Sequence, residues 1–259
     1  MLGKLLKYEI PSVGRKLGPL FIAWGVASAF LGISMRGFEN GGFILVLSIL
    51  LYIAVTVAIF VMMTILIIQR YSNSLLGDEA YFNLVLPVSI NQHIANKTIS
   101  AFVWSTISII AAFVSGFIIF ALSGGLREMI YSVDWAEFKE AMAMLGLSEA
   151  SAVIEFIILS LLSSVKSILA IYAAITIGHQ VRERVVLASI GAYIGLMAAE
   201  SIIGNIFVGT SFFARITDEI PTIVDFHIIM VIGTVLSVGL SIGYFFICKY
   251  LMERRLNLS

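Results

Sequence analysis

Long apolar stretches alternate with short polar connections along the chain, and this pattern predicts its architecture. A helix that crosses a bilayer needs about 20 mostly apolar residues. Six stretches meet this requirement, and we expect spans at 18–34, 43–68, 98–122, 150–177, 185–207 and 226–250. The second and fourth are long enough to tilt or to extend beyond the hydrocarbon. The sequence therefore predicts an all-α, polytopic membrane protein with six transmembrane helices.

The composition agrees with a chain that is embedded in lipid. Of its 259 residues, 60% are hydrophobic and 12% are charged, whereas a soluble domain carries roughly 25% charged residues. The apolar stretches are longer and more continuous than the alternating strands, about 10 residues each, of an outer-membrane barrel. The net charge is zero, so no nucleic-acid partner is expected.

The basic residues predict the orientation, because lysine and arginine accumulate in cytosolic connections. If the N-terminus is cytosolic, most basic residues lie inside: Lys4, Lys7, Arg15, Lys16, Arg70, Lys97, Arg182, Arg184, Lys249, Arg254 and Arg255. The outer connections hold Arg36, Arg127, Lys139 and Arg215, and are otherwise acidic. We therefore expect both termini in the cytosol.

The N-terminal segment 1–17 is predicted to lie in the cytosol before the membrane domain 18–252, and its first ten residues are predicted to form an amphipathic helix. At about 100° per residue, Leu5, Leu6 and Ile10 share an apolar arc, and Pro11 is expected to end the helix. A helix of this kind lies in the membrane interface. Glu9 falls inside the apolar arc, which favours contact with a protein partner; the alternative is a basic anchor that only sets topology. Ala27-Ser28-Ala29 matches a signal-peptide cleavage pattern, but the apolar run continues, so we expect an uncleaved first helix.

The connection 70–97 between the second and third spans carries the most candidate residues for contact with a partner. Residues 73–86 are predicted to form a short helix that Pro87 stops. Acidic and aromatic residues lie together there, and aromatic side chains fill pockets of a partner while carboxylates select a basic rim. The expected contact residues are Asp78, Glu79, Tyr81, Phe82, Leu86 and Pro87. The alternative is an interfacial helix that packs on its own domain.

Ionisable residues inside the spans indicate a second functional region. A lysine at the centre of a span costs about 2.5–3.5 kcal/mol, so Lys166 is expected to face protein or water. We predict that it pairs with Glu200 of the fifth span. Glu155 lies about three turns before Lys166 on nearly the same face. The candidate translocation path is Glu155, Ser163, Lys166, Ser167 and Glu200; the alternative is an ion pair that only fixes helix register.

Two outer segments are predicted to form short helices. Gly204 and Gly209 interrupt the end of the fifth span, which indicates a re-entrant element before the last span or, alternatively, a fraying helix end. The outer loop 123–149 has the pattern of a weak amphipathic helix that caps a pore mouth or lies on the bilayer.

Several catalytic signatures are missing from the sequence. It has no G-x-x-x-x-G-K-[ST] loop and no H-E-x-x-H pair, and His93, His179 and His227 are far apart along the chain. The single cysteine, Cys248, excludes an intrachain disulfide. We expect no bound metal or cofactor, and no enzyme activity in the chain itself.

The chain resembles the permease subunits of type-2 ATP-binding-cassette (ABC) exporters, in the short six-span form of Gram-positive bacteria. The resemblance rests on Leu5-Leu6-Lys7-Tyr8-Glu9 before Gly14-Arg15, on Gly77-Asp78-Glu79-Ala80-Tyr81 through Leu86-Pro87-Val88-Ser89, and on Lys97 and Trp104. Ala80 and Val85 stand where the group often has glycine and threonine.

The resemblance implies a role for each predicted segment. Residues 73–87 would be a coupling helix seated in a groove of a separate ATPase subunit, which would bind ATP and Mg. Two permeases, with a homodimer favoured over a heterodimer, and two ATPases would export a hydrophobic or amphipathic substrate, a peptide by preference, across the bacterial plasma membrane. The rival interpretation is a proton-coupled secondary transporter with Glu155, Lys166 and Glu200 as its relay. A membrane scaffold without transport activity is a third.

Overall fold

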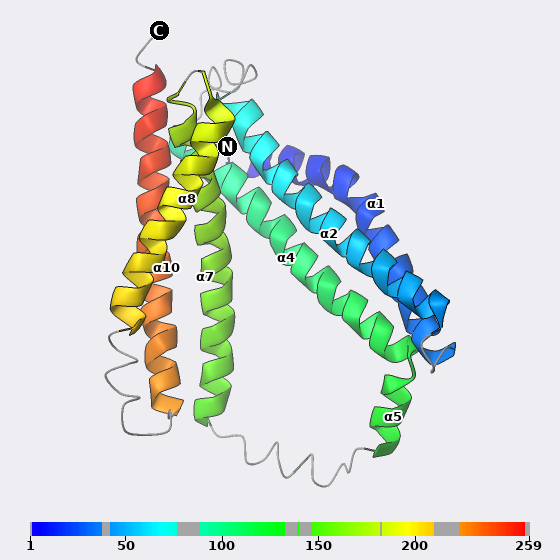
Figure 1. Cartoon of the computed structure of the whole chain (residues 1–259). Helices are drawn as coiled ribbons and strands as arrows, with labels where there is room; N and C mark the ends of the chain where they lie inside the picture. The colour runs from blue at the N-terminus through cyan, green and yellow to red at the C-terminus, as the bar shows by residue number, and fades with distance from the viewer. Residues whose placement is uncertain are drawn as a thin grey trace. The chain divides into compact units, whose positions relative to one another are not determined.

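The computed structural model describes residues 2–37, 42–76, 89–132, 139, 147–181, 183–209 and 223–256. Helices account for nearly all of them, and these residues contain no strand (Figure 1). The α-helices are α1 (Leu2–Gly37), α2 (Phe43–Tyr71), α4 (Ile90–Leu122), α5 (Gly125–Ser132), α7 (Leu147–Gly178), α8 (Val185–Gly204) and α10 (Ile223–Leu256). Two π-helical segments, η1 (Ser72–Leu76) and η2 (Asn205–Gly209), extend α2 and α8. The all-α prediction is confirmed.

Six of these helical stretches are long and apolar enough to cross a membrane. They are Leu5–Gly37, Phe43–Leu76, Ile90–Leu122, Ala150–Gly178, Val185–Phe207 and Val224–Glu253. Each contains most of one span predicted from the sequence. Several extend past the predicted limits, because a helix continues into polar residues as long as its backbone hydrogen bonds are made.

The chain packs as two compact units. The first unit comprises Met1–Ile67 and Ser100–Ala141, and the second comprises Ile68–Ile99 and Met142–Ser259. Both α2 and α4 therefore contribute to each unit. The part of α2 that follows Ile67 and the part of α4 that precedes Ser100 belong with α7, α8 and α10.

The first helix does not end at Pro11, so that prediction is wrong. α1 continues through Pro11 and Pro19, and its ribbon bends rather than stops (Figure 1). A proline removes one backbone hydrogen bond, and a bend with help from neighbouring side chains compensates for that loss. Next to this bend, the indole Nε1 of Trp104 donates to the carbonyl oxygen of Ile10 at 3.1 Å, which joins α1 to α4.

The core of the first unit lies where α1, α2 and α4 meet. Its buried residues are Val13, Leu17, Met63 and Leu66, against which Leu20, Phe21, Ile67 and Trp104 pack. Gly14 makes room for the Trp104 ring, because a Cβ at this position would lie 2.8 Å from that ring. Two further polar contacts join its helices: Trp24 Nε1 donates to Thr56 Oγ1 at 2.9 Å, and the hydroxyls of Tyr52 and Ser115 are 3.0 Å apart.

In the second unit, α7 packs against both α8 and α10. Helices α7 and α10 lie side by side (Figure 1). They run parallel, because residues that come later in α7 contact residues that come later in α10. Glu155 contacts His227, Leu159 faces Gly233, and Ser163 contacts Ser237. Gly178, the last residue of α7, approaches Ser189 of α8 so closely that a Cβ there would collide with the Ser189 backbone.

The two outer segments are described in part. Helix α8 ends at Gly204, as the glycine pattern indicated, and continues as η2; residues 210–222 lie outside the described part, so the re-entrant element stays a prediction. The helix expected in 123–149 is represented by α5, which a turn at Gly124, with a φ of 98°, joins to α4. That positive φ is accessible to glycine at little cost.

Candidate functional site

A line of polar side chains follows α7 where it meets α8 and α10. We call it the polar seam and define it as Glu155, Ser163, Lys166, Glu200, His227, Ser237 and Tyr244. All seven lie in the second unit. Three of the predicted path residues, Glu155, Ser163 and Lys166, come from α7, and Glu200 comes from α8.

The charged centre of the seam is the ion pair of Lys166 and Glu200. The Nζ atom of Lys166 donates to Oε1 of Glu200, which confirms the predicted pairing. The hydroxyl of Tyr244 donates to the other carboxylate oxygen at 3.4 Å. The side chains of Lys166 and Glu200 are 15% and 19% exposed. The carboxylate thus links α7, α8 and α10, and the pair is neutral overall, as a bilayer interior requires.

A second titratable pair lies about 16 Å from Lys166 toward the N-terminal end of α7, at 1.5 Å per residue. Nδ1 of His227 is 2.8 Å from Oε2 of Glu155. His227 escaped the sequence analysis, which weighed the histidines only as metal ligands. The signal was present: the fourth and sixth spans start on the same side of the membrane, and both residues lie within the first turns of their spans.

The serines of α7 divide into two groups. The hydroxyl of Ser163 is 3.3 Å from that of Ser237 on α10, which brings Ser163 into the seam. Ser167 is exposed and donates to the carbonyl oxygen of Ser163 in its own helix at 2.9 Å. Ser160 likewise bonds Phe156 of its own helix. The structure thus joins four of the five predicted path residues to neighbouring helices, and Ser167 is the exception.

At the end of α7, buried tyrosines connect four helices. The rings of Tyr71 (α2) and Tyr172 (α7) stack with centroids 4.0 Å apart and an interplanar angle of 8°. The Tyr71 hydroxyl lies 2.8 Å from Thr176 Oγ1 and contacts Met252 Sδ of α10. Tyr172 donates to the carbonyl oxygen of Lys97 (α4) at 3.2 Å. We call Tyr71, Tyr172 and Thr176 the tyrosine clamp; the sequence analysis missed it, since apolar periodicity does not single out buried tyrosines.

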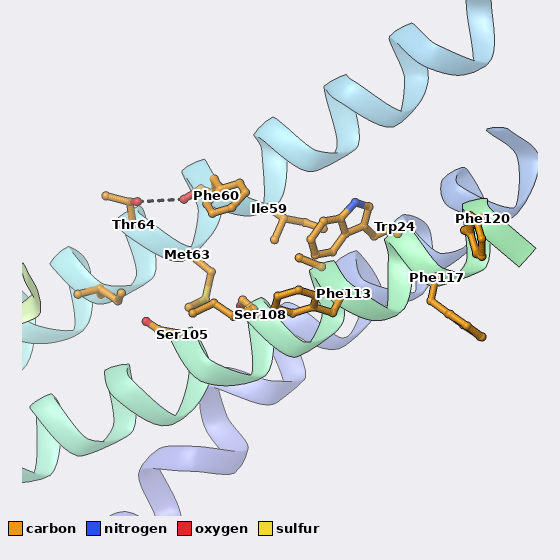
Figure 2. A pocket seen from close by; sticks show the side chains of 14 residues that line it. Trp24, Ile59, Phe60, Met63, Thr64, Ser105, Ser108, Phe113, Phe117 and Phe120 are labelled. Carbon is orange, nitrogen blue, oxygen red and sulfur yellow. Dashed lines mark hydrogen bonds between the residues drawn. The ribbon is translucent and has the colours of Figure 1, made fainter. Parts of the chain in front are cut away.

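The first unit contains an apolar cavity of about 710 Å³. Figure 2 shows aromatic rings and Met63 gathered along α2 and α4, with Ser105 toward one end and Phe120 at the other. The hydroxyls of Thr64 and Ser108 donate to carbonyl oxygens of their own helices, at 2.9 Å each. The rim is open, since Phe113 is 77% exposed. The cavity therefore offers mainly dispersion contacts, and it contains none of the predicted path residues.

Most of the residues that are predicted to contact a partner lie outside the described part of the chain. Asp78, Glu79, Tyr81, Phe82, Leu86 and Pro87 lie outside the described residues, and of the short helix expected at 73–86 only 73–76 are described, as part of η1. Glu9 is described and partly buried on α1. Their roles stay predictions.

Six apolar helices and a paired charge inside them define the class: this is a polytopic α-helical membrane protein. Comparison with known protein families, with curated proteins and with solved structures finds no match to this chain. Within the described ranges, no group of three His, Cys, Asp or Glu residues is placed to hold a metal ion. A more specific function has to be argued from the chain's own residues.

Proposed function

We propose that the chain is the membrane-spanning permease subunit of a type-2 ABC exporter. It would move a hydrophobic or amphipathic substrate, a peptide by preference, out of a bacterial cell through the plasma membrane. A separate ATPase subunit would bind ATP and Mg, and a second copy of the chain would complete the permease pair. The proposal begins from the sequence resemblance of residues 77–89 to a coupling segment.

The observation that carries the proposal is how the helices on either side of residues 77–88 are held. Leu75, before that segment, is 3% exposed, and Ile94, after it, is fully buried. Both belong to the second unit, with the polar seam. A docking segment drives transport only if its ends are fixed to the helices that move, because a loosely attached loop would absorb the displacement. Tight packing of this kind suits a coupling segment.

The cargo class is supported by two features of the spans. The apolar cavity of the first unit suits the hydrophobic face of an amphipathic substrate. Lys166 and Glu200 neutralise each other in an ion pair, so this pair provides no net charge to bind a strongly ionic solute. A hydrophobic or amphipathic peptide fits both features better than a small polar solute.

A proton-coupled secondary transporter is the second candidate, and the contact of His227 with Glu155 favours it. Histidines and carboxylates inside transmembrane bundles form the proton relays of many pumps and transporters. In this mechanism, protonation of the Glu155–His227 pair and of the Lys166–Glu200 pair would alternate with substrate binding.

Purification of the tagged chain from its native membranes separates the two candidates. We expect an ATPase subunit to copurify in about equal amount. We also expect inside-out vesicles to take up a fluorescently labelled amphipathic peptide from the medium only when ATP is present. A partner-free chain whose peptide uptake survives ATP depletion but collapses when the proton gradient is dissipated would favour the secondary transporter and contradict the proposal.

A further inference from the structure

We infer that the apolar cavity of the first unit is a groove that holds one acyl chain of a membrane phospholipid. This inference goes beyond the proposed function and does not depend on it. The groove holds lipid whenever no cargo occupies it, whether ATP or a proton gradient drives transport.

The cavity lies within the membrane-spanning part of the first unit and opens at its surface. All its lining residues belong to that unit, and on α4 they extend from Ser105 to Phe120, inside a helix that is apolar enough to cross the membrane. Its floor is buried, since Trp24 is 2% and Ile59 is 1% exposed, whereas Phe60 on its rim is 61% exposed. The cavity is therefore a groove that opens toward the hydrocarbon of the bilayer.

The groove is narrow for its length. Ser105 and Phe120 lie 15 positions apart on α4, which sets a length of about 22 Å at 1.5 Å per residue. With the volume of about 710 Å³, this length gives a mean width of about 6 Å. A helix with its side chains is about 10–12 Å across, so it can insert only single side chains. Carbon atoms in contact lie about 3.5–4.0 Å apart, so a single file of methylene groups fits along the whole groove.

The lining favours a ligand that forms no hydrogen bonds. Three of its polar side chains donate their hydrogens inside the protein: Trp24 to Thr56, Thr64 to Phe60 and Ser108 to Trp104. An extended peptide brings an N–H and a C=O group at every residue, and each must be bonded inside a bilayer. The groove offers few partners for such groups, whereas an acyl chain needs none.

A second copy of the chain and an empty groove are both disfavoured. The mouth of the groove covers about 130 Å², from its length and width, whereas a stable protein interface buries about 800 Å² on each partner. An empty groove would leave its lining atoms without the dispersion contacts of a packed interior. The acyl chains that surround the spans are the one component of the bilayer that fills the groove without an unbonded polar group.

Quenching of tryptophan fluorescence by brominated lipid tests the inference, because bromine quenches an indole ring only at short range. The purified chain is reconstituted in phosphatidylglycerol vesicles with plain or with dibrominated acyl chains, and Trp24→Phe is treated in the same way. The difference between the two proteins isolates the emission of Trp24 from that of Trp104 and Trp135. We expect brominated chains to quench most of the Trp24 emission, although this side chain is buried in the protein.

Gly116→Leu separates the groove from the rest of the lipid-facing surface. Gly116 lines the groove and nothing lies within 4 Å of its Cβ position, so a leucine side chain has room to extend into the groove. This variant should lose most of the quenching of Trp24. Gly195→Leu on α8 is the matched control, since its Cβ position is equally open and lies outside the groove. It should be quenched like the wild-type protein.

The wild-type protein can overturn the inference without any groove variant. If the emission of Trp24 is the same in plain and in brominated vesicles, no acyl chain lies in the groove. Equal quenching in folded Gly116→Leu and in the wild-type protein also overturns the inference, because the quenching lipid then lies elsewhere. Ala112→Leu, one turn earlier in the lining, replaces Gly116→Leu if that variant does not fold. None of these results bears on copurification of an ATPase, which tests the proposed function separately.

Discussion

The two units differ in the kinds of contact that join their helices. In the first unit, the core of α1, α2 and α4 is apolar, and its helices are joined by neutral hydrogen bonds: Trp24 with Thr56, Tyr52 with Ser115, and Trp104 with Ile10. In the second unit, α7, α8 and α10 are joined by an ion pair and by hydroxyl and imidazole contacts. Apolar packing in lipid gives little preference for one register, whereas paired polar groups select one. Both units therefore contain polar contacts that favour one alignment, and the second unit adds an ion pair to them.

Breaking the ion pair should give the largest effect. Lys166→Met leaves the Glu200 carboxylate without its counter-charge inside the protein, and loss of one partner of a buried pair costs about 3–5 kcal/mol. We expect a matching loss of stability in a detergent unfolding titration. The control is Lys166→Met with Glu200→Gln, which removes both charges and should recover most of the loss. A double variant as unstable as the single one would show that the pair does not act as a unit.

Overpacking the α7–α8 crossing should come next. In Gly178→Ala, the new methyl group meets the Ser189 backbone, which cannot rotate away as a side chain can, and such overpacking costs about 1–3 kcal/mol. Gly191→Ala on α8 is the matched control, since nothing lies within 4 Å of its Cβ position. Thermal unfolding should separate the two variants clearly. Equal melting temperatures would contradict the close approach.

In the first unit, Gly14→Ala probes the contact between α1 and α4. The methyl group would push against the Trp104 ring, which can shift, so we expect a smaller loss of about 1 kcal/mol. Gly18→Ala, four residues later with open space around its Cβ position, corrects for the higher helix propensity of alanine. Tryptophan emission should change in Gly14→Ala and stay constant in Gly18→Ala. Identical emission spectra and stabilities of the two variants would contradict the close contact between Gly14 and Trp104.

The smallest effect tests whether hydroxyl contacts differ between the units. Ser163→Ala removes the contact with Ser237 on α10, and an interhelical hydrogen bond in a membrane protein contributes about 0.6 kcal/mol on average. Tyr52→Phe removes the corresponding contact with Ser115 in the first unit. We expect both variants to lose similar, small amounts in the same unfolding titration. A several-fold larger loss for Ser163→Ala would mean that the seam is cooperative.

The sequence was sufficient for the fold class, because six apolar stretches leave a membrane helix bundle as the one good solution. It was also sufficient for the Lys166–Glu200 pair, since two opposite charges inside neighbouring spans are stable only together. The continuation of α1 through Pro11 was not predictable in this way. The contact beside Pro11 comes from Trp104, which lies more than ninety residues away and donates to the Ile10 carbonyl oxygen.

The clamp and the His227 contact were missed for a related reason. Hydropathy describes each span separately, whereas Tyr71 finds Tyr172, and Glu155 finds His227, only after distant helices pair in a definite register. The apolar cavity is also a property of three helices together rather than of one pattern. Polar contacts between spans are the part of a membrane fold that a single sequence specifies least directly.

In-cell photo-cross-linking from position 81 tests the central claim most directly. A photoreactive phenylalanine analogue in place of Tyr81 should link the chain to an ATP-binding subunit, and Glu79→Lys in the same chain should weaken that link while membrane insertion stays normal. The claim is contradicted if a cysteine in place of Tyr81 instead reacts, from outside intact cells, with a maleimide that cannot cross the membrane.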